Sequence, residues 1–437
     1  MIGWIERRVP PVSAEAAALF RIIFGALLLA YFLTHAVEAD WIARAAPESP
    51  LHRLVLPALE AAPGIADWIA PWIALWAVLF IAGVLTRLSF AMMTAGAVAW
   101  SLVYTMRVGA HSVEVLLVVM LCLLAAPWSE VWSVERWWRG RLVDRHPSRA
   151  YGYAIWILGF VLGTSLAAAA FAKIRLGGIG WITNGTVKYH FLTDSPDAPV
   201  DWGLRIARYD GLAVLLSLAA VAMEGLVLFG ACATGYGYRL AAGIGTLALL
   251  VGFALFQGLF WPAWWLLLLA FLPWHLVRLQ PDTTYERDTT YKSTWRPASA
   301  GPLQAFVVAA VVLQQGVASA LRIEVPPFIS AFDMYSSTYA SPADYESKAG
   351  MSYRIAASFA DGRMDSCRVT REDADAVARR VTPRLARVLE NCFDTAAPSV
   401  RAVSVEGIRR KVDWARWRLG DEVRMPLAGP IVLRGDP

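Results

Sequence analysis

Apolar blocks of roughly 18–22 residues recur along this chain of 437 residues, and they constrain its fold more than any other feature. At 1.5 Å of rise per residue, a helix of that length crosses about 30 Å of hydrocarbon. A segment inside a bilayer must satisfy its own backbone hydrogen bonds, so each block is predicted to be a helix. The blocks predict an all-α polytopic membrane bundle of about nine transmembrane helices, over residues 14–34, 68–86, 88–106, 112–128, 151–172, 210–232, 239–256, 258–278 and 303–321.

The composition agrees with a membrane location and excludes an ordinary soluble domain. Hydrophobic residues make up 57% of the chain and charged residues 17%, whereas soluble domains average about 45–50% and about 25%. Many of the 20 tryptophans flank the apolar blocks, where an indole prefers the headgroup zone. The net charge of +5 comes from scattered residues, so we expect membrane lipid as a partner and no nucleic acid.

Charges in the loops predict the orientation. Loops on one side carry most of the arginines, including Arg7, Arg8, Arg87 and the group between Arg136 and Arg149. The positive-inside rule therefore places the N-terminus in the cytoplasm, and an odd number of spans places the C-terminus outside, with a bacterial inner membrane as the expected location. The loop 173–209 departs from the rule because its basic residues fall on the outer side: Lys173, Arg175, Lys188, Arg205 and Arg208.

A change in composition near residue 323 predicts two domains. Residues 1–322 form the transmembrane domain, and residues 323–437 form a small extramembrane α+β domain on the extracytoplasmic side. Within it we expect a strand over 351–359, a turn at Gly362, an amphipathic helix over 371–393, and strands over 401–405 and 411–418.

The four cysteines divide into two groups. Cys122 and Cys232 fall inside predicted spans and are most simply buried apolar residues. Cys367 and Cys392 lie in the C-terminal domain, where an oxidising compartment would favour a disulfide between them. Two free thiols are the alternative if that domain faces the cytoplasm.

Ionisable residues within predicted spans are candidates for function because they are costly in hydrocarbon. Lys173 ends an apolar small-residue helix, and partial desolvation there would favour a neutral amine competent as a general base. It could instead be an ordinary lysine that extends to the interface. Glu224, in the middle of the sixth span, could form an internal polar site or bond a neighbouring helix as structural glue.

Two further positions carry polar side chains near membrane boundaries. His111 and Ser112 open the fourth predicted span, and Glu114 lies one turn on, so a histidine–carboxylate pair ready for proton transfer is one reading and a helix cap is the other. Arg21, near the cytoplasmic end of the first span, is expected to extend its side chain to the interface or to contact lipid phosphate. No Cys/His spacing repeats, so no metal site is predicted.

At these residues the chain resembles the horizontally transferred transmembrane (HTTM) domain family, which includes the vitamin K-dependent gamma-glutamyl carboxylases. The resemblance covers roughly residues 10–320. It is carried by the opening span ALFRIIFGALLL, by the pair His111-Ser112 followed by the motif Trp132–Glu135, by FAKIRLGGIGW with Gly185, and by AFLPW ending at Trp274.

The resemblance implies a quinol-dependent carboxylation, or a related modification, of a secreted polypeptide. By resemblance, Lys173 would be the base that deprotonates a reduced, vitamin K-like quinone, and His111 would transfer or orient a proton. Ser112, Glu224 and Trp181 would belong to the quinone-binding site. The stretch from Lys173 to Trp181 is longer than in the carboxylases, and their large soluble portion is much reduced here, so their recognition of a substrate propeptide is not expected to transfer.

Two other classes of function compete with an enzyme. A non-catalytic export or maturation factor for a secreted peptide would use residues 323–437 as a docking module and leave Lys173 and His111 structural. A transporter ranks last, since the sequence lacks visible inverted repeats and paired helices broken by proline or glycine.

Overall fold

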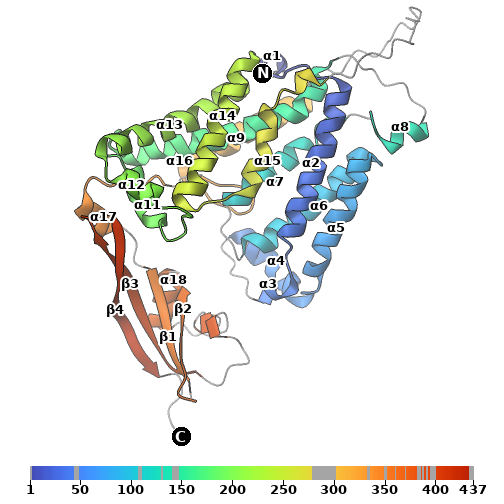
Figure 1. Ribbon diagram of the computed structural model, residues 1–437. Helices are drawn as coiled ribbons and strands as arrows, with labels where there is room; N and C mark the ends of the chain where they lie inside the picture. The colour runs from blue at the N-terminus through green and yellow to red at the C-terminus, as the bar shows by residue number, and fades with distance from the viewer. Residues whose placement is uncertain are drawn as a thin grey trace, which may run out of the picture.

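The chain forms a helical bundle followed by a small β-sheet (Figure 1). A computed structural model describes residues 2–43, 49–106, 111–128, 131–139, 147–277, 302–331, 335–348, 352–359, 361–369, 371–380 and 400–432, with residues 385, 388, 389, 392 and 393. The first residues and the sheet lie at opposite ends of the bundle (Figure 1).

Seven helices in the described part are long and apolar enough to cross a membrane. They are α2 (Ala14–Thr34), α5 (Ile65–Ala82), α6 (Thr86–Thr105), α9 (Arg149–Gly177), α13 (Asp210–Cys232), α14 (Tyr236–Gln257) and α16 (Pro302–Leu321). Each corresponds to a predicted span, so apolar length alone identified the membrane-spanning core.

The other two predicted spans are shorter, so a count of nine is not confirmed. The block 112–128 forms α7 (His111–Leu123), and the block 258–278 forms α15 (Pro262–Leu266) with the 3₁₀ turn η1 (Leu267–Phe271). Proline explains both, because Pro127 and Pro273 follow these helices and the residue before a proline disfavours helical geometry.

The remaining helices are short and lie between the long ones or beside the sheet. They are α1 (Ile2–Arg8), α3 (Ala39–Ala43), α4 (Pro50–Ala61), α8 (Val134–Arg139), α10 (Gly180–Thr183), α11 (Val187–Asp194), α12 (Trp202–Ala207), the 3₁₀ turn η2 (Trp274–Leu276) and α17 (Pro342–Lys348).

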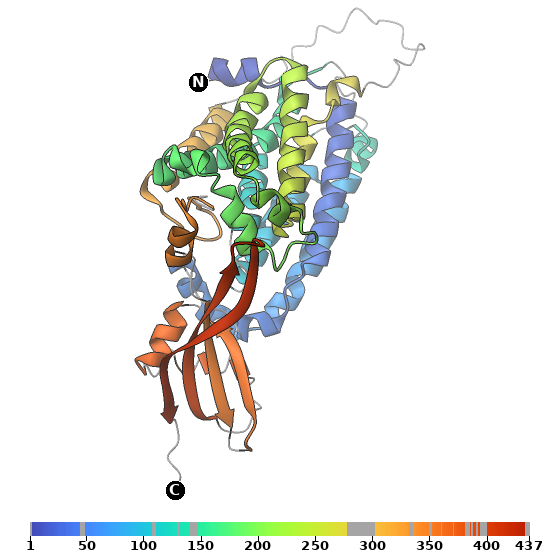
Figure 2. The ribbon, with the colours of Figure 1, turned by 60° about the vertical axis from the view of Figure 1, so that its left-hand side comes forward.

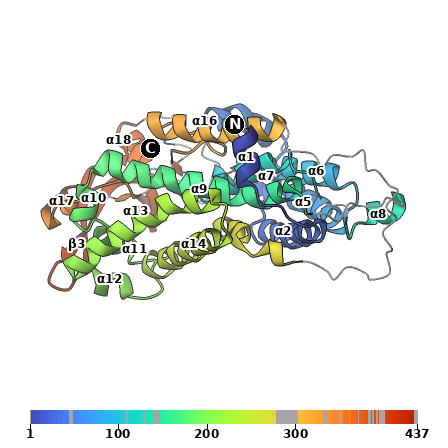
Figure 3. The ribbon, with the colours of Figure 1, turned by 90° about the horizontal axis from the view of Figure 1, so that it is seen from above.

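Helix α9 is the central element of the bundle. In its most apolar stretch 89% of residues are buried, against 22% in α13, and Figure 3 shows it between α16 on one side and α13 with α14 on the other. Small residues allow the close approach to α13: a Cβ on Gly163 would lie 2.7 Å from the Cα of Leu228, and one on Gly159 would lie 3.6 Å from the Cβ of Ala231.

The C-terminal sheet is antiparallel, with strand order β2-β1-β3-β4. Its strands are β1 (Ser352–Phe359), β2 (Met364–Val369), β3 (Val400–Asp413) and β4 (Arg418–Val432). The strand predicted over 351–359 and the turn at Gly362 agree with the structure. Strand β2 was not predicted, and the single strand predicted over 411–418 is wrong, because that stretch holds the end of β3, a tight turn and the start of β4.

One face of this sheet carries a separate apolar core. Alternate residues Ile355, Ala357 and Phe359 of β1 are buried there, against α18 (Arg371–Ala378). The helix predicted over 371–393 ends at Ala378, before Arg380 at a φ of 56°, and its predicted continuation lies largely outside the described residues.

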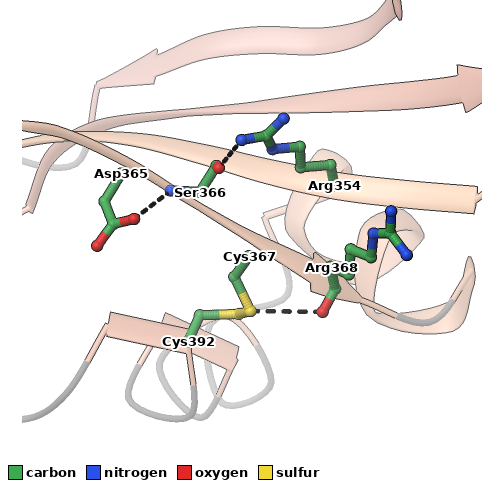
Figure 4. Close-up of a disulfide and its surroundings, with 6 residues drawn as sticks. All are labelled: Arg354, Asp365, Ser366, Cys367, Arg368 and Cys392. Carbon is green, nitrogen blue, oxygen red and sulfur yellow. Dashed lines mark hydrogen bonds between the residues drawn. A yellow bond between two sulfur atoms is a disulfide. The ribbon is translucent and has the colours of Figure 1, made fainter. Parts of the chain in front are cut away.

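A disulfide joins Cys367 on β2 to Cys392, as predicted for an oxidising compartment (Figure 4). Beside it, Arg354 on β1 donates a hydrogen bond to Ser366 on β2 (Figure 4). The bridge therefore ties the edge strand of the sheet to the segment that follows α18.

The β3–β4 hairpin reaches back to the bundle (Figure 2). Its turn carries Trp414 and Trp417, whose rings lie 6.2 and 5.9 Å from the ring of Tyr189 on α11. Arg208 beyond α12 donates to the carbonyl of Arg416 at 3.0 Å. Tyr339 and Tyr345, which precede the sheet, pack on the same tyrosine. The junction between sheet and bundle is therefore an aromatic cluster centred on Tyr189.

The contact between α9 and α13 predicts the effect of one added methyl group. We expect Gly163→Ala to destabilise the bundle by about 1–3 kcal/mol, because the new methyl overlaps the backbone of Leu228. Thermal unfolding of the detergent-solubilised protein measures the effect. Gly225→Ala is the control, because a Cβ at Gly225 meets nothing within 4 Å. Equal midpoints for the two variants would contradict the close packing described above.

Candidate functional site

A buried ion pair joins the two most closely packed helices of the bundle. Lys173, near the end of α9, donates from Nζ to both carboxylate oxygens of Glu224 on α13, at 2.8 and 2.9 Å. The two side chains are 5% and 2% exposed. The cost of removing two opposite charges from water is offset only when they are paired with good geometry, and here both carboxylate oxygens lie within hydrogen-bonding distance of Nζ.

The ring of Trp181 covers the lysine. Nζ of Lys173 lies 5.6 Å from the centre of the indole, a distance at which the ring face attracts a cation. The Trp181 N–H donates to the carbonyl of Tyr335 at 2.8 Å, which fixes the ring. Lys173, Glu224 and Trp181, singled out separately in the sequence, therefore lie together.

The loop that carries Trp181 is held against α13. Gly185 has a φ of +60°, and a Cβ there would lie 2.9 Å from the Cβ of Ala213, so both the backbone and the space favour glycine. Two residues on, the N–H of Val187 donates to the hydroxyl of Ser217 at 3.2 Å. These contacts place α10 and α11 over the ion pair.

His190 on α11 is the imidazole nearest this group among the described residues, and the sequence analysis missed it. Its ring stacks on Trp181 with a centroid distance of 6.3 Å and meets the ring of Tyr335 edge-on at 4.9 Å. Burial, together with the positive charge of Lys173, lowers the pKa of His190 to about 3, so the ring is neutral at physiological pH. A histidine inside the apolar run VKYHFL was the available signal.

The Nε2 atom of His190 is buried with no hydrogen-bond partner among the described residues. His190 also forms hydrogen bonds with the backbone of Ser337 and Tyr335, and these bonds act to raise its pKa. That direction is expected when a ring N–H donates to backbone carbonyls. Because the neutral ring carries one proton, Nε2 is then a bare acceptor.

Asp194, the last residue of α11, joins this group of residues through Tyr335. Gln257 donates to Asp194 at 2.9 Å, and the hydroxyl of Tyr335 also bonds this carboxyl. Burial raises the pKa of Asp194 to about 6, although the two hydrogen bonds act in the opposite direction. Tyr335 thus contacts both the imidazole and an acidic group.

The basic residues of the loop 173–209, which broke the charge pattern, mostly have local partners. Lys188 lies 2.6 Å from Asp210, and Arg175 donates to the carbonyls of Ser319 and Ala320 at the end of α16. Lys173 pairs with Glu224, and Arg208 bonds the hairpin. These charges are therefore accounted for by contacts on their own side of the bundle.

The other candidate residues from the sequence lie elsewhere in the bundle or outside the described side chains. His111 and Ser112 begin α7, but nothing is described of their side chains, so their roles in proton transfer and quinone binding stay predictions. Glu114 is 2% exposed and lines a small cavity between α7, α9 and α16. Within the described residues, no three His, Cys, Asp or Glu side chains gather as metal ligands would.

Arg21 does not contact lipid headgroups, so that expectation was wrong. Its side chain is fully buried and donates to the carbonyl of Trp132 at 2.8 Å. Glu135 closes the same unit: its N–H donates to the carbonyl of Gly83, and its carboxylate accepts from the N–H of Thr86. The motif Trp132–Glu135 therefore closes the turn between α5 and α6.

Comparison of the chain with protein-family models, with curated proteins and with solved structures finds no match in any of the three. The site must accordingly be interpreted from its own geometry.

Removal of one partner of the ion pair should cost more than removal of both. We expect Lys173→Met or Glu224→Gln to destabilise the protein by about 3–5 kcal/mol, because each leaves a buried charge without its partner. The double variant should lose less than either single variant. A double-mutant cycle on unfolding in detergent measures this coupling, and additive losses would show that the pair is not energetically linked.

Asp194 should make stability depend on pH. Its folded-state pKa of about 6 lies above the ordinary 3.8, so the folded protein binds this proton more tightly than the unfolded chain does. The resulting stability is present at acid pH and is lost as the pH rises from about 4 to about 6. Asp194→Asn should remove this part of the pH profile of the unfolding midpoint, whereas Asp421→Asn, at an exposed position on β4, should retain it.

Proposed function

We propose that this chain is an integral membrane enzyme that removes a proton from a reduced quinone, as the resemblance to HTTM carboxylases implies. The observation that carries the proposal is the Lys173–Glu224 pair, buried beneath Trp181 and beside a neutral imidazole. Ion pairs inside an apolar bundle are expensive, and groups of this kind concentrate where protons are moved.

The geometry suggests how the two partners divide the work. An ammonium has three N–H donors, and Glu224 accepts two hydrogen bonds from Lys173, so one donor remains for a substrate oxygen. Glu224 is then the group that accepts the proton from a quinol hydroxyl. Lys173 stays protonated and stabilises the oxygen anion that results. The base in this assignment is Glu224, whereas the sequence had indicated its partner Lys173.

The polar groups of the cluster suit the hydroxyl end of a quinol. The Lys173 ammonium offers a donor, and Nε2 of His190 offers a buried acceptor. The proposal places the quinone ring next to Trp181, because the two groups that would hold its hydroxyl lie against that indole. A reduced quinone and dioxygen give the quinone epoxide and water, and this reaction supplies the strong base that lets carbon dioxide carboxylate a glutamate side chain.

The proposed site would act on secreted polypeptides. Positive loop charges favour a cytoplasmic N-terminus, and in Figure 1 the sheet lies at the opposite end of the bundle. The Cys367–Cys392 disulfide supports an oxidising compartment for the sheet, such as the periplasm of a bacterium with this protein in its inner membrane.

The direct test is quinol epoxidation by the purified protein in lipid nanodiscs, with dioxygen, carbon dioxide and a glutamate-containing peptide present. We expect epoxide from the unmutated protein and a loss of at least about 100-fold in Lys173→Met and Glu224→Gln, typical for removal of a group that transfers a proton or stabilises its anion. Lys188→Met is the matched control, because Lys188 pairs with Asp210 rather than with Glu224. Absence of epoxide from the unmutated protein would dismiss the proposal.

A non-catalytic export or maturation factor is the second candidate. It is favoured by the balanced charge of the ion pair, which serves equally well as a structural link between α9 and α13. On this alternative, a secreted peptide co-purifies with the unmutated protein and with Lys173→Met, and the hairpin variant Trp414→Ala/Trp417→Ala releases it. Peptide capture that survives the hairpin change would count against this role.

A further inference from the structure

A second polar site lies within the bundle, apart from the ion pair. It is a cavity between α7, α9, α16 and the segment 328–330, with room for one water-sized particle. Polar side chains line it from three helices: Glu114, Thr164, Ser165, Gln314 and Gln315. Such convergence is unusual inside an apolar bundle, where each polar group is costly unless it is satisfied.

The hydroxyl donors on α9 are directed away from the cavity. Thr164 and Ser165 both donate to the carbonyl of Val161, at 2.8 and 3.1 Å. Each hydroxyl has one hydrogen, so these two oxygens can act only as acceptors toward the cavity.

The amide donors on α16 are used in a similar way. Gln314 donates to the carbonyl of Phe328, and Gln315 donates to the carbonyl of Ser330 at 3.1 Å and to the hydroxyl of Ser319 at 3.2 Å. Both hydrogens of the Gln315 amide are thereby used, and its carbonyl oxygen remains an acceptor. Among the donors of Thr164, Ser165, Gln314 and Gln315, only the second hydrogen of the Gln314 amide is not used in this way, so these side chains offer the cavity mostly acceptors.

The backbone beside the cavity is irregular on one side, over residues 323–331. After α16 ends at Leu321, the chain folds back so that Phe328 and Ser330 lie level with Gln314 and Gln315. Irregular backbone at membrane depth is tolerated where it is buried in protein or lines a cavity. Unwound backbone and polar side chains together form the sodium sites of many membrane proteins.

We infer that this cavity binds a single sodium ion. Oxygen acceptors with their donors turned away match a hard cation, and Glu114 adds a carboxylate to the lining. A divalent ion fits less well, because Ca²⁺ takes six to eight oxygens and Mg²⁺ usually keeps several waters, for which this cavity has no room. Potassium is larger than sodium and would need a wider cage.

The test compares thermal unfolding of the full-length protein in detergent with NaCl, KCl or choline chloride at equal ionic strength. We expect a saturable rise of the midpoint by a few degrees in NaCl and a smaller rise or none in the other two salts. Thr164→Val and Gln315→Leu should abolish the sodium response. Thr246→Val is the matched control, because Thr246 is also buried and bonds its own helix, but it lies on α14 outside the cavity.

Direct binding of radioactive ²²Na⁺ to the unmutated protein keeps the test decisive if a variant fails to fold. Saturable binding that excess unlabelled sodium displaces, and potassium does not, is the expected result. Identical midpoints in the three salts, or no saturable binding, would mean that the cavity holds water and would overturn the inference. The outcome is independent of quinol turnover.

Discussion

The arrangement of this protein depends on one ion pair in a place where unpaired charge is not tolerated. Lys173 and Glu224 come from the two helices with the closest packing, and glycine at 159 and 163 lets those helices approach. The ring of Trp181 lies over the paired lysine, and His190 of α11 packs on that ring. The short helices α10 and α11 are therefore in contact with the ion pair through Trp181 and His190, in addition to their direct contacts with α13.

Local contacts account for most of the five basic residues in the loop 173–209, which departs from the charge pattern of the other loops. The positive-inside rule counts lysines and arginines in short loops, whether or not they are paired. Here Lys188 is held by Asp210, and Arg175 by the carbonyls at the end of α16. Most basic residues of this loop therefore make structural contacts of their own, which gives a reason for their presence other than topology.

Elements that follow from a local property of the sequence could be predicted from it. Elements that depend on contacts between distant segments could not. The seven long helices follow from apolar length, and β1 from a strand-like run ended by a glycine turn. Lys173 and Glu224 could be singled out because ionisable residues at the end or in the middle of an apolar span are costly, and Trp181 was named through the resemblance. His190 was missed because its importance comes from Tyr335, which is 145 positions away in the sequence. Strand β2 has few apolar residues and exists because β1 offers it a partner.

The position of Tyr189 next to His190 has a mechanical consequence. One side chain anchors the tip of the hairpin, and the next one rests on the indole over the lysine. Displacement of the hairpin tip would therefore shift the backbone next to the buried imidazole, and it would also strain the contacts of Arg208, Tyr339 and Tyr345 at the same junction.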